Sequence, residues 1–161
     1  MGRARPARPD DLGRLAELAA EAVGEQQVGR GGAVWAAREG PQLPAGPALR
    51  AALDDDGALV LAGTYDDVVV GYAVAHTEPL RDGTTLAVVD AVYVEPPARE
   101  VGVGEALLEA VLAWADARGC RGVDALVLPG NRSAKNFFER FGLVARAILV
   151  HRPLHRGGEG A

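Results

Sequence analysis

Apolar residues recur along the chain at two spacings, and the change from one spacing to the other predicts where helices and strands lie. Helical spacing is clearest after Asp10 and Asp11, either of which can cap the helix, and again from Gly102 to Arg118. Gly119 then stands where a helix commonly ends. The predicted helices cover, in chain order, residues 11 to about 23, 34–38, 48–53, 102–118 and 133–141.

Shorter apolar runs rich in β-branched residues predict the strands. Three of these runs follow one another closely, separated by turns at 66–67 and 82–83, as in an antiparallel meander. The segment between 24 and 47 carries many glycines and prolines and predicts mainly loop. The predicted strands cover, in chain order, residues 3–6, 58–65, 68–76, 85–95, 122–128 and 143–153.

This order of elements predicts a mixed α/β (α+β) sheet with helices packed on its faces. A length of 161 residues suits one domain, which we place at residues 1–154. The polar, glycine-rich residues 155–161 are predicted to form a flexible C-terminal tail.

Composition narrows the classes of function. The formal net charge of −5 argues against general nucleic-acid binding and favours a cationic partner. No apolar run approaches the roughly 20 residues of a membrane span, and the basic N-terminus has no apolar run after it, so no membrane partner is expected. Cys120 is the single cysteine, which excludes an internal disulfide and suits a reducing cytoplasm. The three histidines lack metal-ligand spacing, so no metal site is predicted.

The junction between the third strand of the meander and the long helix carries the strongest chemical signal. Residues 99–104 place two glycines before a helix, where uncovered backbone N–H groups and the helix dipole favour an anion such as a pyrophosphate. Arg99 adds a guanidinium suited to phosphate oxygens. A dinucleotide-binding fingerprint would need a third glycine where Leu107 stands, and a Walker loop would need lysine where Glu105 stands. Close packing of the helix on the sheet is the other explanation of the glycines, and it stays open at this point.

Two sequence blocks, taken in order, resemble the signatures of the GNAT acetyltransferase superfamily. The first is the Arg-x-x-Gly-x-Gly pattern at 99–104, after a strand that ends Val94-x-Pro96. The second is the run 131–143, in which an Asn and an Ala are followed by an aromatic-Glu-x-x-Gly pattern. Together the blocks cover residues 85–150. The resemblance implies a GNAT-like domain with a mostly antiparallel central sheet flanked by helices, and acetyl-CoA as the cofactor.

The resemblance also implies an activity. A GNAT-like enzyme would transfer an acetyl group from acetyl-CoA to a primary amine by direct attack in a ternary complex. The acceptor would be a small cationic amine, or the peptide amine of a protein N-terminus or a lysine. The N-terminal third, which would define the acceptor, carries no recognisable signature. Dimers are common among similar proteins, so a homodimer is compatible with the resemblance.

The family motifs can be carried onto this chain residue by residue. The loop and helix start would hold the CoA pyrophosphate, and the last residues of the preceding strand would pair with the pantetheine arm. Asn131 would bond the cofactor arm, although an Asn before a helix can equally be only its cap. The implied cofactor-binding residues are Val92, Tyr93, Val94, Arg99, Glu100, Val101, Gly102, Val103, Gly104, Asn131, Lys135 and Phe138.

Acyl transfer requires a neutral amine, so a base must remove its proton. Asp90 is our candidate, because some small-amine acetyltransferases of this family have a catalytic carboxylate at the matching place in the strand. A carboxylate that sits at a bulge, or that pairs with an arginine, is the alternative explanation for an acid in this apolar run. Glu95, Glu78 and His76 are weaker candidates for the base.

The proton donor departs from the family pattern. Phe138 fills the place where the family often has a tyrosine that protonates the CoA thiolate, and phenylalanine cannot donate a proton. Tyr93, which we count with Asp90 as catalytic, or Tyr72 is a substitute, or the thiolate leaves unassisted, since a thiol pKa near about 8.5 makes it a tolerable leaving group. The same departure keeps open a second interpretation, a non-catalytic domain that binds acyl-CoA for sensing.

Overall fold

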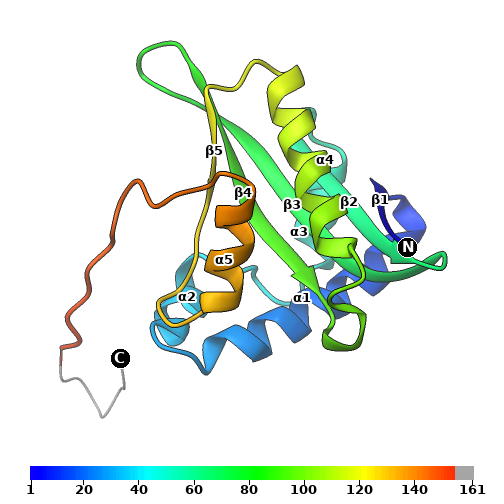
Figure 1. The fold of residues 1–161 in the computed structure, drawn as a ribbon, viewed down its shortest axis with the longest axis horizontal. Helices are drawn as coiled ribbons and strands as arrows, with labels where there is room; N and C mark the ends of the chain where they lie inside the picture. Colours follow the sequence, from blue (N-terminus) through cyan, green and yellow to red (C-terminus); the bar gives the residue numbers. More distant parts are fainter. Residues whose placement is uncertain (155–161) are drawn as a thin grey trace.

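The computed structural model describes residues 1–154, and its centre is a five-stranded sheet with the strands in chain order (Figure 1). The first four strands pair antiparallel, and the last pair is parallel. The predicted mixed α/β class, with a mostly antiparallel sheet, is therefore confirmed. The strands are β1 (Gly2–Pro6), β2 (Ala58–Tyr65), β3 (Val68–Pro79), β4 (Thr85–Val94) and β5 (Gly122–Ala125).

Helices cover both faces of the sheet. Neighbouring residues of β2, Val60 and Leu61, belong to two different buried clusters, because successive side chains of a strand point to opposite faces. The cluster that contains Leu61 is covered by α4, and the cluster that contains Val60 is covered by α1 and α3. The helices are α1 (Leu12–Gln27), α2 (Gly32–Arg38), α3 (Gly46–Leu53), α4 (Val103–Ala117) and α5 (Arg132–Arg140), with 3-10 turns η1 (Pro9–Asp11) and η2 (Pro96–Ala98).

The start of α1 differs from the predicted cap. Asp11 occupies the N-cap position, but its carboxylate does not cap α1. It accepts two hydrogen bonds from the Arg5 guanidinium, at 2.7 and 3.0 Å, and one from the backbone N–H of Arg8 at 2.7 Å. The bond from Arg5 lowers the pKa of the Asp11 carboxyl. The residue therefore fastens the end of β1 to the start of the helical layer.

The predicted last strand at 143–153 is wrong for the described chain. The segment from Leu143 is extended, but no strand pairs with it among residues 1–154. Its apolar side chains face solvent, with Val144 75% exposed and Ile148 85% exposed. A run of strand-forming residues becomes a strand only where an adjacent strand satisfies its backbone, and this segment leaves the sheet (Figure 1). The predicted flexible tail, 155–161, lies outside the described residues.

Candidate active site

The sheet opens along the end of β4. The pairing of β4 with β5 ends at Val89 and Ala125, whereas its pairing with β3 continues to Val94. Within the described chain, residues 90–94 of β4 therefore have no strand on the side where β5 had been. The opening is part of a groove of about 890 Å³, bounded by β4, α4, α5 and the C-terminal end of α1. This volume lies in the range of ligand-binding clefts.

Most of the residues predicted to bind the cofactor do line this groove. Those that line it are Val92, Tyr93, Val94, Arg99, Glu100, Gly104, Asn131 and Phe138. Four others do not. Val103 is buried in the core, Lys135 is exposed and 3.6 Å from the carboxylate of Glu139, and Val101 and Gly102 form the loop beneath the groove.

The N-terminus of α4 presents free backbone donors to the groove. Gly102 is its N-cap and has φ of +87°, a conformation that favours glycine. The first intrahelical bond from this end runs from the N–H of Ala106 to the carbonyl of Gly102, which leaves the N–H groups of Val103, Gly104 and Glu105 without helical partners. The N–H of Arg99, which was predicted to join them, donates instead to the carbonyl of Pro96.

The surroundings of Gly104 show whether packing of α4 on the sheet is enough to explain a glycine at this position. A Cβ built on Gly104 would meet Phe137 at 3.5 Å and Val94 at 3.8 Å, which are ordinary contacts. The helix could therefore lie on the sheet with alanine at this position. Since both neighbours line the groove, the missing side chain enlarges the groove at the helix N-terminus. The free N–H groups at the start of α4 and the space beside Gly104 fit a phosphate group, and packing does not account for this glycine.

Arg99 is held by a carboxylate that the sequence did not indicate. Its guanidinium donates to both oxygens of Glu25 in α1, at 3.0 and 2.9 Å, and to the carbonyl of Val94 at 2.8 Å. The guanidinium also lies over the ring of Tyr93, 5.5 Å from its centroid. Tyr93 donates its hydroxyl proton to Glu25 at 3.2 Å. Burial of the phenol and the nearby Glu25 carboxylate raise the pKa of Tyr93 to about 12, so the phenol is protonated at neutral pH.

Changing Glu25 to Gln is expected to strengthen acetyl-CoA binding several-fold. The carboxylate competes with a phosphate for the Arg99 guanidinium, and it adds negative charge to a groove that would hold an anion. Calorimetric titration with acetyl-CoA measures the effect, and Glu21→Gln, on the same helix but outside the groove, is the control. A higher Kd in Glu25→Gln would mean that Glu25 serves to position Arg99.

Two more arginines line the groove and were missed in the sequence. Arg30 follows α1, and Arg140 ends α5, where it lies 3.4 Å from Glu105 and over the ring of Phe137. Neither belongs to a motif, because only the fold brings these distant segments to one side of the groove. With Arg99, they give the groove three guanidinium groups for phosphate oxygens.

Asn131 fulfils the capping role and still faces the groove. Its side-chain oxygen accepts a hydrogen bond from the N–H of Ala134 at 3.1 Å, which caps α5. The carboxamide nitrogen makes no hydrogen bond to the residues that the structure describes, and it remains a donor for a ligand. Phe138 lines the same wall with its ring.

Asp90 lies at a β-bulge, as one of the alternative explanations proposed. Val74 and Ala75 of β3 face Ala91 and Val89 of β4, so Asp90 has no partner in the register. Its side chain is 42% exposed, and its carboxylate lies 2.7 Å from Nδ1 of His76. The two weaker carboxylate candidates lie elsewhere: Glu95 binds Arg14 at 2.8 Å, and Glu78 is exposed at the far end of β3. The structure thus joins Asp90 and His76 in one pair.

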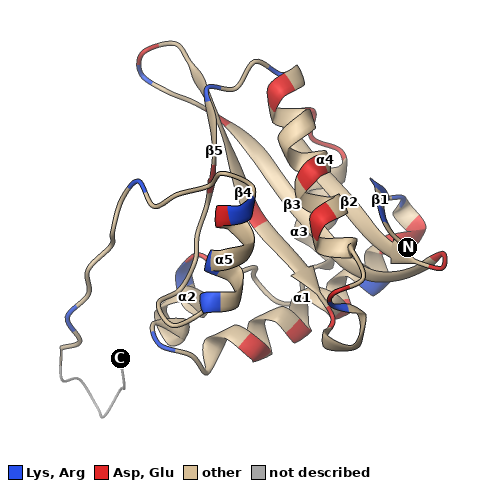
Figure 2. Ribbon diagram, viewed as in Figure 1, with Lys and Arg blue, Asp and Glu red and all other residues tan. Residues whose placement is uncertain are grey.

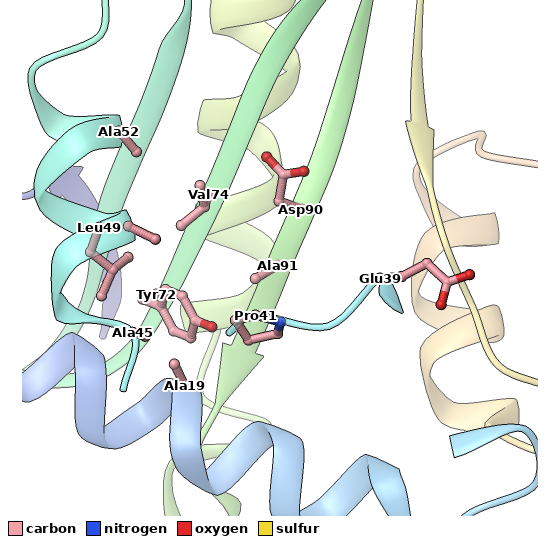
Figure 3. A pocket seen from close by; sticks show the side chains of 11 residues that line it. Ala19, Glu39, Pro41, Ala45, Leu49, Ala52, Tyr72, Val74, Asp90 and Ala91 are labelled. Atoms are coloured by element: carbon pink, nitrogen blue, oxygen red, sulfur yellow. The ribbon is translucent and has the colours of Figure 1, made fainter. Parts of the chain in front are cut away.

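A second, smaller pocket lies along β4, next to the residues that line the groove (Figure 3). It measures about 290 Å³ and is walled by small apolar side chains of α1, α3, β3 and β4. Tyr72 is only 1% exposed and turns its hydroxyl into the pocket, and burial raises the pKa of Tyr72 to about 12. Asp90 supplies a carboxylate, whereas the carboxylate of Glu39, which also lines the pocket, points away from it in Figure 3. No Lys or Arg of the described chain lines this pocket.

The two pockets meet on consecutive residues of one strand. Asp90 and Ala91 line the smaller pocket, and Val92, Tyr93 and Val94 line the groove. A ligand in each would therefore be in reach of the other near Ala91 and Val92, where the backbone edge of β4 is free.

Comparison with known proteins identifies the class that this fold and groove define. The family model described as the acetyltransferase (GNAT) family matches residues 25–143, which is most of the chain. The chain belongs to the GNAT acetyltransferase family, and the class of enzyme is therefore acyltransferase. No curated protein sequence matches it.

Solved structures share the fold at low sequence identity. A transcriptional regulator from Bacillus halodurans C-125 has a TM-score of 0.75 and 18% identity, over 96% of this chain and 100% of the other. The structure of AAC(6')-Iy in complex with the bisubstrate analogue CoA-S-monomethyl-acetylneamine has a TM-score of 0.72 and 18% identity, over 97% of this chain and 99% of the other. An aminoglycoside acetyltransferase, HMB0005, from an uncultured soil metagenomic sample has a TM-score of 0.69 and 17% identity, over 96% and 99%. A ribosomal-protein-alanine N-acetyltransferase from Brucella melitensis biovar Abortus 2308 has a TM-score of 0.67 and 17% identity, over 96% and 100%.

None of the helices in residues 1–154 has both the length and the apolar content needed to cross a membrane. In the same part of the chain, no cluster of His, Cys, Asp and Glu side chains has the arrangement of a metal site.

Proposed function

We propose that this chain is an N-acetyltransferase whose acceptor is a small cationic primary amine. The observation that carries the proposal is the pair of pockets on one strand, the larger with free N–H donors and arginines that suit an anion, and the smaller with the carboxylate of Asp90 and no lining Lys or Arg among the described residues. GNAT acetyltransferases take acetyl-CoA as the acyl donor, and the three arginines and the free α4 amides suit its phosphates.

The smaller pocket suits the acceptor by size and charge. A volume of about 290 Å³ holds a small molecule, and its apolar walls suit a short hydrocarbon chain. Asp90 favours a positive charge there, and the hydroxyl of the buried Tyr72 can accept a hydrogen bond from an amine. Two structural neighbours are named for amine acceptors, an aminoglycoside and a ribosomal-protein alanine, which supports an amine as the acceptor class.

Each residue then has a part in the transfer. Acetyl-CoA supplies an activated thioester. The free edge of β4 at Val92 to Val94 orients the acetyl carbonyl beside the amine and can donate an N–H to its oxygen. Asp90, held by His76, accepts the proton that the ammonium must lose before its nitrogen can form the new C–N bond. As the C–S bond breaks, the nitrogen releases its second proton to solvent, the Tyr93 hydroxyl gives a proton to the leaving sulfur, and solvent restores the phenol.

Binding and turnover together test the proposal. Calorimetric titration should detect tight binding of acetyl-CoA and none of NAD. A panel of amines, with release of the CoA thiol as the readout, should then show turnover with small cationic amines and little with neutral or acidic ones. Turnover mainly with peptide N-termini or lysine would change the acceptor class. Tight binding without turnover on any amine would favour the sensing interpretation that Phe138 left open.

A further inference from the structure

The hydroxyl of Tyr72 is a hydrogen-bonding group that the described chain leaves unpaired. The residue is only 1% exposed and packs in the cluster that α1 and α3 cover. Its hydroxyl makes no hydrogen bond within residues 1–154, yet every side-chain N or O atom shut off from solvent there has a partner. The hydroxyl is therefore the part of Tyr72 that opens into the smaller pocket, as Figure 3 shows. A ligand that bonds to it satisfies a polar group that is otherwise left among apolar neighbours.

Tyr93, which faces Tyr72 across the pair of β3 and β4, shows the contrast. Its hydroxyl donates to Glu25 at 3.2 Å, and its side chain lines the groove. The two phenols thus serve different pockets, and Tyr93 already has a protein partner. The partner of the Tyr72 hydroxyl is to be sought among ligands of the smaller pocket.

The protonation state of Tyr72 defines what this partner can be. Burial raises the pKa of Tyr72 to about 12, so the phenol keeps its proton at neutral pH. A protonated phenol can donate one hydrogen bond and can also accept. An ammonium group has only donors, and it would leave the proton of the phenol without an acceptor. A neutral oxygen, such as a hydroxyl, accepts that proton and can donate in return.

The charges around the smaller pocket also call for a neutral group beside Tyr72. The strands β3 and β4 carry one acid each, Glu78 and Asp90, and no Lys or Arg (Figure 2). The Glu39 carboxylate points away from the pocket and lies 3.9 Å from Nε of Arg38. Asp90 therefore remains as the counterion for the amine that reacts. A second ammonium or a carboxylate beside Tyr72 would be desolvated without an opposite charge, which is costly.

The strand register sets the separation of the two polar ends of the pocket. Val74 pairs with Ala91, beside the bulged Asp90, and Tyr72 lies two residues further along β3. Residues two apart on a strand are separated by about 6.6 Å, which a few bonded atoms of a ligand can span. Between these ends the walls are largely alanines of α1 and α3, which leave room for a short hydrocarbon chain.

We propose that the acceptor is a short amino alcohol and that Tyr72 selects it. The phenol bonds to the hydroxyl of the acceptor, while Asp90 takes the proton of its amine at the other end of the pocket. This inference rests on the proposed acetyl transfer and names the substrate class of the same site. An alkylamine of equal size leaves the phenol unpaired, and a diamine of equal size places a second charge beside it.

Three amines of matched size test the selection, with release of the CoA thiol as the readout. They are 3-amino-1-propanol, n-butylamine and 1,3-diaminopropane, which differ only in a terminal hydroxyl, methyl or amino group. The amino alcohol should exceed n-butylamine in kcat/KM by about 10- to 100-fold, because the alkylamine leaves a buried polar group without a partner. The diamine should fall about tenfold or more below the amino alcohol.

Two variants assign the preference to one hydroxyl group. Tyr72→Phe keeps the ring in the core, and it should lower kcat/KM for the amino alcohol about 10- to 100-fold while n-butylamine changes little. The Kd for acetyl-CoA should stay constant, since Tyr72 does not line the groove. Tyr65→Phe is the matched control. It removes a phenol hydroxyl from β2, outside both pockets, and should leave all three rates unchanged.

The outcomes separate this inference from the proposed acetyl transfer. Equal kcat/KM for the amino alcohol and n-butylamine, or a preference that survives in Tyr72→Phe, would overturn the inference and leave acetyl transfer in place. If none of the amines is acetylated, NMR titration of the same amines decides the inference by binding alone. Weaker binding of the amino alcohol to Tyr72→Phe would support the assignment of the pocket. Equal binding to both proteins, or none to either, would overturn it.

Discussion

Replacing Gly104 with glutamate is expected to abolish acetyl-CoA binding while the chain stays folded. The Cβ of the new residue meets only ordinary contacts, so the helix keeps its place. A glutamate in the first turn of α4 also suits the helix dipole, and any residue but proline costs less than glycine inside a helix, by up to about 1 kcal/mol. The melting temperature should therefore hold or rise.

The loss of binding has two causes. The new side chain occupies the groove between Phe137 and Val94. Its carboxylate accepts hydrogen bonds from the α4 backbone N–H groups that a phosphate would use. Repulsion between the carboxylate and a phosphate adds a penalty of a few kcal/mol at close range. We expect the Kd for acetyl-CoA to rise about 100-fold or more. Gly104→Ala should have a smaller effect, because it adds bulk without charge.

The control places the same charge on the same helix away from the groove. Ala113 is exposed on α4, so Ala113→Glu changes the net charge equally but should leave the Kd unaltered. If Gly104→Glu binds acetyl-CoA as the unchanged chain does, the pyrophosphate does not lie at the α4 N-terminus, and the assignment of the groove is wrong.

Replacing Asp90 with asparagine is expected to lower kcat about 10²- to 10⁴-fold, the usual contribution of a positioned general base. Asparagine keeps the size of the side chain and can still bond to His76, but it cannot take the amine proton. The Kd for acetyl-CoA should stay nearly constant, since Asp90 lines the smaller pocket and not the groove. Steady-state rates with an amine found by the panel, together with calorimetry, give both values.

Two further variants sharpen this result. Glu78→Gln removes an exposed carboxylate from β3, two residues beyond His76 toward the turn, and it should leave kcat unchanged. His76→Gln removes the partner of Asp90 and should lower kcat less than Asp90→Asn if His76 only positions the carboxylate. A larger loss in His76→Gln would make His76 the base. An unchanged kcat in Asp90→Asn would exclude Asp90 altogether.

The sequence predicted the elements whose signal is local. Apolar periodicity placed β2 at the residues where the structure has it, and α4 within one residue at each end, because their patterns are long and regular. The loop at 99–104 was found for the same reason, since its glycines and the helix after them are adjacent in the chain. Residues 92–94 were assigned to the same cofactor site through the resemblance to the family motif.

Features that depend on distant segments could not be predicted. Glu25, Arg30 and Arg140 enter the groove from α1, the loop after it and α5, and nothing in their own neighbourhoods marks them. The apolar stripe of α5, with Phe137 and Phe138, would suit a core, yet no residue of α5 is buried and both rings line the groove. Apolar periodicity identifies a surface that needs cover and cannot tell whether protein or ligand provides it.

The bulge in β4 is another feature that the sequence could not predict. Strict alternation would have given Asp90 a partner in β3, but the extra residue releases it from the ladder and leaves it exposed beside His76. Apart from Asp90 itself, no residue in the run from Val88 to Ala91 signals a bulge, because a bulge depends on how two strands pair. The acid in an apolar run was the only local sign of the departure.

The shared lining of the two pockets along β4 has a consequence for motion. Neighbouring residues of a strand are about 3.3 Å apart but point to opposite faces, so the pockets lined by Ala91 and by Val92 can meet only across the free edge of β4. Alignment of donor and acceptor is then a property of one stiff strand, held on its other side by β3 up to Val94. Substitutions that weaken the pairing of β3 with β4 should therefore misalign donor and acceptor and lower kcat before they weaken the binding of either substrate.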